Sequence, residues 1–327
     1  MKISENDICF CWSWKKYKDC CLNNEHPSRL TYDEFAEVDA KKYWWIIPPS
    51  VFRNHILKLS NKCLICESKP IKSHTLSAKR LRESFKSNFV SWVLPDENRI
   101  LRLTKVPINK ASALPLRCKY HDEIFNPIDQ DLNFSDNLHL NLLSYRTLWR
   151  DLRWLTCQLK TLYSNIVLYD FPFQIKLAEL YLRAREMNEF TNYVYKWLNN
   201  TNWNWLHHNI YKIWRISPIF ASWAIHYDIS NDRNNRKHII ILNLIYKDGI
   251  WFLIVSYKNW DEVTKNYSKI FDIKKHNRIE YIKFLNEFIW KHCENIICDE
   301  SRDWEYIQSI NDWLLYEHWE HDYIRIV

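Results

Sequence analysis

A single glycine, Gly249, stands in a chain of 327 residues. Average glycine usage of about 7% would supply roughly 23 glycines in a chain of this length. Glycine adopts positive φ without steric cost, so tight turns normally depend on it. Either residues other than glycine form the tight turns of this chain, or some of its positions are glycine in the living protein although the sequence records another residue.

Tryptophan, normally a rare residue, occurs 18 times. The segments SWVLPDEN, NNTNWNW, FASWAIHYD and YKNWDEV predict turns if their tryptophan is glycine. Trp251 and Trp304 fit their surroundings as true tryptophans. We hypothesise that most of the others are glycines in the living protein, because the gene decodes UGA as glycine. The abundance of Lys, Asn, Ile and Tyr is typical of the AT-rich genomes that favour such a codon. UGG codons at Trp12 and Trp14 would refute the hypothesis, and a genuinely tryptophan-rich protein is the alternative.

The composition, 47% hydrophobic and 26% charged residues, can support a buried core in a soluble protein. The longest apolar runs, HIIILNLIY and GIWFLIVSY, are shorter than the roughly 18 residues of a membrane span. The start MKISENDICFC lacks the apolar core of a secretory signal. We therefore expect a soluble, cytoplasmic protein with no membrane partner. Its ten cysteines are then metal ligands or free thiols rather than disulfides, and the isolated Cys157, Cys293 and Cys298 are ordinary core or surface thiols.

Four cysteines lie close together in CFCWSWKKYKDCC, residues 9–21. With glycine at positions 12 and 14 this segment closely resembles the SEC-C motif, a zinc knuckle found at the tail of the SecA translocation ATPase and in many bacterial proteins. The resemblance rests on two cysteine pairs that flank Ser13 and a basic-aromatic run. It implies a structural Zn²⁺, which four thiolates suit chemically, with the ligands Cys9, Cys11, Cys20 and Cys21. The basic residues between the pairs, which we expect to contact phosphates, are Lys15, Lys16 and Lys18.

A second candidate site consists of Cys63-x2-Cys66 and Cys118-x2-His121, two half-sites of the kind that share one zinc. Residues 67–117 separate the halves, a gap that a hairpin and a helix can span. Two unrelated pairs are the alternative. Residues 60–120 also hold 13 Lys and Arg against four acidic residues, which indicates either a polyanion partner or a solvated face. For the first case we expect phosphate contacts from Lys72, Lys79, Arg80 and Arg82.

His74 follows the first half-site, and this order resembles HNH endonucleases, in which a treble-clef fold carries a CxxC pair, a His-bearing strand and a second ligand pair. The resemblance implies His74 as the general base that activates water, Asn109 as its orienting residue and Asp122 as a ligand of a second divalent metal. The sequence departs from that pattern, because Ser73 replaces an acidic residue or histidine and Asn109 lies too far from Cys118. We therefore favour a binding module, which needs only a closed zinc site and a basic surface.

Hydrophobic patterning predicts an α+β protein with a zinc knuckle at 1–25 and a helical linker at 26–60, broken by two prolines. A treble-clef or HNH-like zinc module follows at 61–135. Apolar residues spaced by three and four predict helices at 136–165 and 172–200 within a helical region 136–205. The C-terminal part, 206–327, begins with a small antiparallel sheet at 207–257, with a Lys247-Asp248-Gly249 turn. Helices are predicted at 260–271, 278–297 and 301–319.

These features favour a zinc-binding protein that binds nucleic acid or a ribonucleoprotein such as the ribosome. An HNH-like endonuclease is one alternative. A protein-interaction adaptor is another, because SEC-C knuckles in translocation ATPases engage protein partners. No P-loop, Rossmann fingerprint or Gly-x-Ser-x-Gly elbow occurs, even with glycine in place of tryptophan.

Overall fold

The computed structural model describes residues 16–19, 63, 65–66, 68–95, 101–165, 171–198, 205–213, 219–227, 238–272, 280–281, 284–285, 287–289, 293 and 295–299. The four cysteines of the predicted knuckle, the linker 26–60 and the helix predicted at 301–319 lie outside these residues. Within 1–25, the structure describes a short 3₁₀ turn, η1 (Tyr17–Asp19). None of the described helices is long and apolar enough to cross a membrane.

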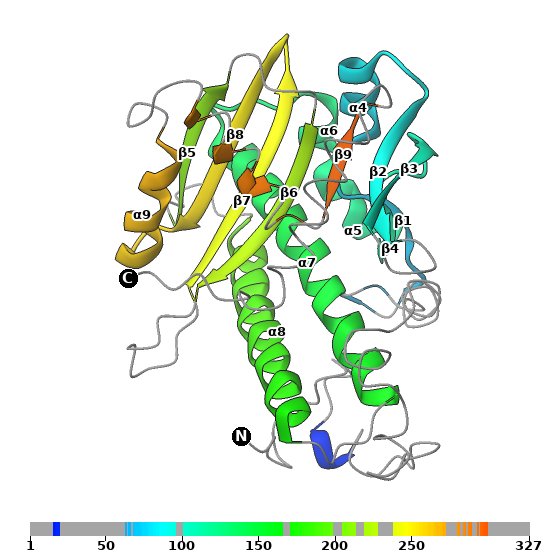
Figure 1. The fold of residues 1–327 in the computed structure, drawn as a ribbon, viewed down its shortest axis with the longest axis vertical. Coiled ribbons are helices and arrows are strands. Elements are labelled where there is room, and N and C mark those ends of the chain that lie inside the picture. Colours follow the sequence, from blue (N-terminus) through cyan, green and yellow to red (C-terminus); the bar gives the residue numbers. More distant parts are fainter. Residues whose placement is uncertain are drawn as a thin grey trace.

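A seven-stranded antiparallel sheet forms the centre of the described fold (Figure 1). Its strands, in spatial order, are β3 (Leu101–Pro107), β2 (Phe89–Pro95), β9 (Ile296–Cys298), β6 (Ile219–Tyr227), β7 (His238–Lys247), β8 (Ile250–Lys258) and β5 (Leu206–Ile213). β7 and β8 are buried along almost their whole length. That burial follows from their continuous apolar sequences, which favour a strand covered on both faces.

Two long helices, α7 (Asn137–Asn165) and α8 (Phe171–Trp197), pack side by side. α7 contacts β6 and β7, and both helices extend beyond the sheet (Figure 1). A shorter helix, α9 (Glu262–Ser268), contacts β7 and β8 and continues into the 3₁₀ turn η3 (Lys269–Phe271). Asp261 caps α9 by accepting a hydrogen bond from the backbone nitrogen of Thr264. The helices predicted at 136–165, 172–200 and 260–271 are thus confirmed.

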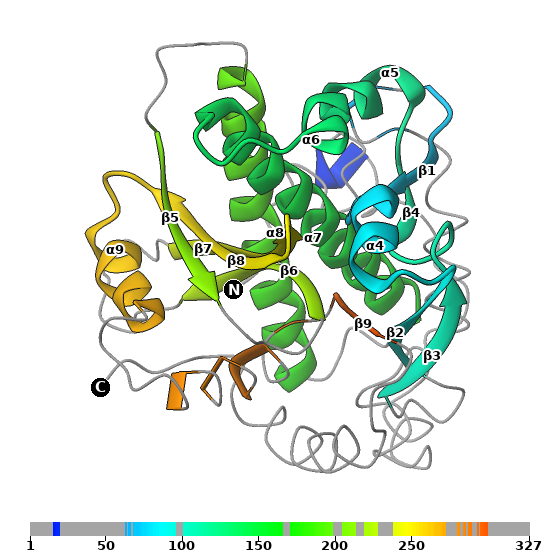
Figure 2. The ribbon, with the colours of Figure 1, turned by 90° about the horizontal axis from the view of Figure 1, so that it is seen from above.

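A small two-stranded sheet pairs β1 (Ile71–His74) with β4 (Ala113–Arg117). Between these strands lie the helix α4 (Ala78–Phe85) and the β2–β3 hairpin, which are the kinds of element that can span the gap between the two half-sites. After β4 come α5 (Lys119–Asp122), η2 (Glu123–Phe125) and α6 (Asn126–Gln130). η2 and α6 contact α7, and the view from above shows α5 and α6 grouped near the helical pair (Figure 2).

The sheet is larger than the small sheet predicted for 207–257, because β2, β3 and β9 extend it. β9 inserts between β2 and β6, so strands from residues 61–135 and 206–327 share one sheet. The helix predicted at 278–297 is correct only in part. Residues 287–289 are helical, but 296 and 297 belong to β9.

The predicted turns around the tryptophans have mixed outcomes. Trp92 lies in β2 and Trp223 in β6, so the turn predictions at these two residues are wrong. Trp260 does lie in a turn, directly after β8. Among the described residues, positive φ occurs at Lys86, Ser112, Asp248 and Gly249, and at no tryptophan. The expected β7–β8 turn at Asp248-Gly249 is present, and the codon hypothesis stays a prediction.

Candidate metal centre

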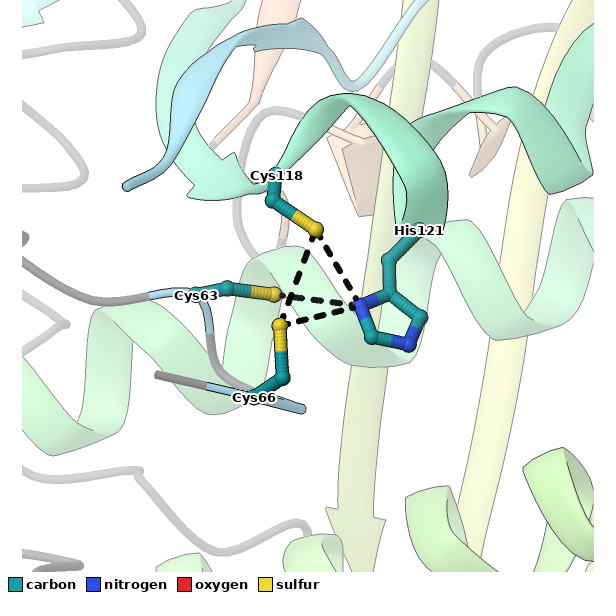
Figure 3. A group of neighbouring side chains, drawn as sticks. All are labelled: Cys63, Cys66, Cys118 and His121. Atoms are coloured by element: carbon teal, nitrogen blue, oxygen red, sulfur yellow. Dashed lines mark hydrogen bonds between the residues drawn. The ribbon is translucent and has the colours of Figure 1, made fainter. Parts of the chain in front are cut away.

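The side chains of Cys63, Cys66, Cys118 and His121 converge on one point (Figure 3). Cys63 and Cys66 belong to the loop that leads into β1, and Cys118 and His121 belong to the start of α5. Antiparallel pairing places Ile71 opposite Arg117. Because both pairs lie just beyond that end of the two-stranded sheet, the pairing brings them together across 51 intervening residues.

The four donor atoms lie within 4.8 Å of one another. His121 Nδ1 is 3.5 Å from the sulfurs of Cys63 and Cys66, and 3.3 Å from that of Cys118. The sulfurs of Cys66 and Cys118 are 3.7 Å apart. This set of three sulfurs and one imidazole nitrogen could hold a metal ion, and no second group of three or more such donors occurs among the described residues.

Backbone hydrogen bonds fix the loop that carries the first two cysteines. The backbone nitrogen of Cys63 donates to the carbonyl of Ser68 at 2.8 Å, which closes the loop. The backbone nitrogen of Ile65 points at the Cys63 sulfur at 3.5 Å. Hydrogen bonds with Ser68 also lower the pKa of Cys66, which favours its thiolate form. The local fold therefore prepares this loop for ligation.

The pKa of the other two ligands is set mainly by burial. Burial raises the pKa of the Cys118 thiol. Burial, and secondarily the charge of Arg117, lower the pKa of His121. His121 is therefore neutral at neutral pH, as metal coordination requires. Because Cys63, Cys118 and His121 are buried and Cys66 is only partly exposed, the cluster has the closed character of a structural site.

A column of aromatic rings connects the cluster to the long helices. The ring of His121 meets that of Tyr195 in α8 edge-on at 6.5 Å. Tyr195 stacks on Tyr145 of α7 at 5.7 Å, and Tyr145 stacks on Phe125 at 5.9 Å. Sequence reasoning missed this column. The only signal was the aromatic stripe of the helices, which predicts a core but not its neighbour.

The three predicted catalytic residues have different surroundings, although the charge of Asp122 acts on His74. His74 ends β1, and its Nδ1 donates a 3.0 Å hydrogen bond to the carbonyl of Ala111. Burial lowers the pKa of His74, although the bond to Ala111 opposes this shift. Asn109 lies exposed in the turn after β3. Asp122 forms an ion pair with Arg117 at 3.5 Å. The contact that orients His74 therefore comes from a backbone carbonyl.

The predicted phosphate-binding residues differ in their exposure. Lys72, Lys79 and Arg82 are exposed. Lys79 donates to the carbonyl of Gln130 at 2.8 Å. Arg80 is buried on the inner face of α4 and donates to the carbonyl of Ile128 at 3.0 Å, so its prediction as a phosphate contact is wrong. In the predicted knuckle Lys16 is exposed and Lys18 partly buried, whereas Lys15 lies outside the described residues.

Comparison with protein-family models, curated proteins and solved structures finds no match for this chain. The functional assignment therefore depends on the site itself.

Proposed function

We propose that the chain is a zinc-binding protein in which Cys63, Cys66, Cys118 and His121 hold a structural Zn²⁺. The spacing of the donor atoms carries this proposal. Tetrahedral zinc with ordinary bond lengths separates a sulfur from a nitrogen ligand by about 3.5 Å and two sulfurs by about 3.8 Å. The corresponding separations are 3.3–3.5 Å and 3.7 Å. These four separations suit zinc, and the other donor pairs lie within 4.8 Å.

The order of elements supports a treble-clef-like module. A ligand-bearing loop, a two-stranded antiparallel sheet and a helix that begins with the second ligand pair follow one another, with α4 and the β2–β3 hairpin inserted between the two strands. In such a site the ion cross-links the protein and catalyses no reaction, because protein side chains fill all four of its coordination positions. The role of the four side chains is then to fix the loop before β1 to α5.

Metal analysis of the full-length protein tests this proposal. We expect the site to retain a full equivalent of zinc through purification. The variants Cys66→Ser and Cys118→Ser should each lose that equivalent. Cys298→Ala is the matched control, because Cys298 is a buried thiol of β9 outside the cluster. Unchanged zinc content in both ligand variants would contradict the assignment, as would a wild-type protein free of bound metal.

The partner that best fits the surroundings of the centre is a nucleic acid. Lys69, Lys72 and Lys119 are exposed, and the side chain of Tyr120 is 74% exposed. Lys69 precedes Ile71 by two residues, and Lys119 follows its pairing partner Arg117 by two. The two lysines therefore extend from the same end of the small sheet, next to Tyr120. Exposed cations beside an exposed ring suit phosphates and a stacked base.

Fluorescence anisotropy with labelled single-stranded DNA and RNA tests this part of the proposal. Binding should weaken steeply as salt rises, because displaced counterions drive it. Lys119→Glu and Tyr120→Ala should each weaken binding. Lys212→Glu is the control, since Lys212 is exposed on β5, at the opposite edge of the seven-stranded sheet. Equal effects of the Lys119 and Lys212 substitutions would leave no role for this surface.

A nuclease is the second candidate, and the orientation of His74 favours it. Because Nδ1 donates to Ala111, the neutral ring carries its lone pair on Nε2. A neutral imidazole held in this tautomer suits a general base. Incubation of the protein with plasmid DNA and Mg²⁺ or Mn²⁺ separates the candidates. Cleavage that His74→Ala abolishes supports the nuclease, whereas retained binding without cleavage supports the binding module.

A further inference from the structure

Arg117 is the largest of the fully buried side chains among the described residues. It ends β4 and directly precedes the ligand Cys118. None of its three guanidinium nitrogens has a hydrogen-bond partner among those residues. A carboxylate oxygen of Asp122 lies 3.5 Å away, and the guanidinium carbon is 3.9 Å above the centre of the Phe125 ring. A buried cation with so few partners is unusual, because burying a charge without hydrogen bonds is costly.

A second buried cation makes the position of Arg117 less favourable. The guanidinium carbon of Arg146 lies 4.5 Å from the centre of the same Phe125 ring. Arg146 has its own counterion, because its two terminal nitrogens contact the two oxygens of Asp129 at 2.7 and 2.6 Å. Arg117 has only a single and longer contact, with Asp122 at 3.5 Å. Burial and the charge of Arg146 lower the pKa of Arg117 to about 10, so it remains charged at neutral pH.

A loaded metal centre would carry the opposite charge. Three thiolates and one neutral imidazole around a divalent ion have a net charge of about −1, since metal ligation requires deprotonated cysteine. Arg117 is adjacent to Cys118 in the chain, and its charge acts on His121. The loaded centre would thus supply Arg117 with negative charge beyond that of Asp122, whose carboxylate oxygen lies 3.5 Å away.

We propose that Arg117 is a charge-compensating residue of the metal centre, and that metal loading offsets part of the cost of burying its guanidinium. This inference rests on the proposed zinc site. Among the described residues, no hydrogen bond joins the Arg117 guanidinium to a ligand of the ion. Arg117 acts through its electric field, and therefore belongs to the residues that tune the centre.

Competition with a chromogenic chelator measures the zinc affinity of the full-length variants. We expect Arg117→Met to weaken affinity by about 10- to 100-fold, the usual effect of altering the surroundings of a metal site. Arg117→Lys keeps the charge and should retain affinity close to that of the wild type. Arg146→Met is the matched control, because it removes a buried arginine from the same ring and should leave zinc affinity unchanged.

Thermal unfolding with and without chelator distinguishes the proposed role of Arg117 from a purely structural one. Arg117→Met should lower the Tm of the zinc-loaded protein. In the chelated protein it should leave the Tm unchanged or raise it, because it removes a buried charge that only the 3.5 Å contact with Asp122 compensates. Equal losses in both states with unchanged zinc affinity would overturn the inference, as would equal effects of the Met and Lys variants on affinity. A wild-type protein that binds no zinc would instead overturn the proposed function, and this inference with it.

Discussion

The side-chain amide of Asn295 donates a 3.2 Å hydrogen bond to the hydroxyl of Thr75, a residue 220 positions earlier in the chain. The same amide donates to the hydroxyl of Ser222 in β6 at 2.9 Å. Thr75 directly follows His74 and donates to the carbonyl of Ser112. All four polar groups are buried. This network joins the segment that carries the candidate metal ligands to β6, the strand in the middle of the large sheet.

Removal of the amide should therefore destabilise the whole fold. We expect Asn295→Leu to lower the free energy of unfolding by about 1–3 kcal/mol, because it leaves two buried hydroxyls without their donor. Urea denaturation followed by circular dichroism measures the change. Asn266→Leu, at an exposed position of α9, is the control and should have little effect. Equal losses in the two variants would contradict the role of the network.

Stability should fall in acid because of His208. Its Nε2 donates to the amide oxygen of Asn141 at 3.0 Å, and its Nδ1 accepts from the hydroxyl of Ser256 at 2.7 Å. Burial, and then the charge of His207, lower the pKa of His208 from 6.5 to about 3. The unfolded chain then binds more protons than the folded protein between these values. His208 accordingly contributes its full stability above pH 6.5 and loses it as the pH falls.

The slope of that loss is at most about 1.4 kcal/mol per pH unit. Denaturant unfolding at several pH values from 7 down to 4 measures it. His208→Gln removes the titrating group, so we expect a shallower dependence on pH in this variant. If the two proteins lose stability in parallel, other groups determine the acid sensitivity.

Gly249 should be hard to replace, and for a purely backbone reason. Its φ is +82°, and a Cβ built there meets no atom within 4 Å. Gly249→Ala should cost about 1–2 kcal/mol through left-handed backbone strain alone. Gly249→Asn should cost less, because asparagine tolerates this conformation. Thermal unfolding of both variants tests the order, and a larger loss for asparagine would point to a side-chain clash instead.

Removal of the metal should loosen the segment that the aromatic column attaches to the helices. If free zinc stands 100-fold above its dissociation constant, chelation removes about 2.7 kcal/mol of stability. Hydrogen exchange of the chelated protein should then rise in residues 118–125, because His121 and Phe125 lie at the two ends of the column. The amides of β7 and β8 serve as the internal reference and should change less. A uniform rise across both regions would contradict a local effect.

Replacement by glycine should affect the free energy of unfolding differently at two of the tryptophans. Trp149 of α7 is 3% exposed, whereas Trp260 is 53% exposed in a turn. Trp149→Gly should cost about 3–5 kcal/mol from the cavity and about 1 kcal/mol from helix propensity. Trp260→Gly should cost far less. Urea denaturation compares them, and a similar tolerance at both positions would contradict the packing described for α7.

The elements that the sequence predicted correctly are those specified by local pattern. α7 and α8 follow from the spacing of their apolar residues, and the β7–β8 hairpin follows from two apolar runs on either side of Asp248-Gly249. β9 could not be predicted in this way. It is three residues long, and only its distant partners β2 and β6 make it a strand. Its apolar side chains suit a helix equally well.

In the candidate metal centre, too, local sequence patterns could be interpreted, whereas contacts between distant residues could not be predicted. The spacing of Cys63, Cys66, Cys118 and His121 predicted a shared centre, because ligand chemistry restricts the possible residues. The burial of Arg80 could not be predicted from its charge, since it depends on which face of α4 packs inward. The burial of Arg117 was equally hidden, because a basic residue in a basic segment predicts exposure.

The insertion of β9 between β2 and β6 imposes an order on biosynthesis. β2 is completed at Pro95, but the strand that covers its inner edge ends only at Cys298. At a translation rate of about 5–20 residues per second, the ribosome needs roughly 10–40 s to make that strand. During this interval the edge of β2 presents unpaired backbone N–H and C=O groups, which can pair with a strand of another chain.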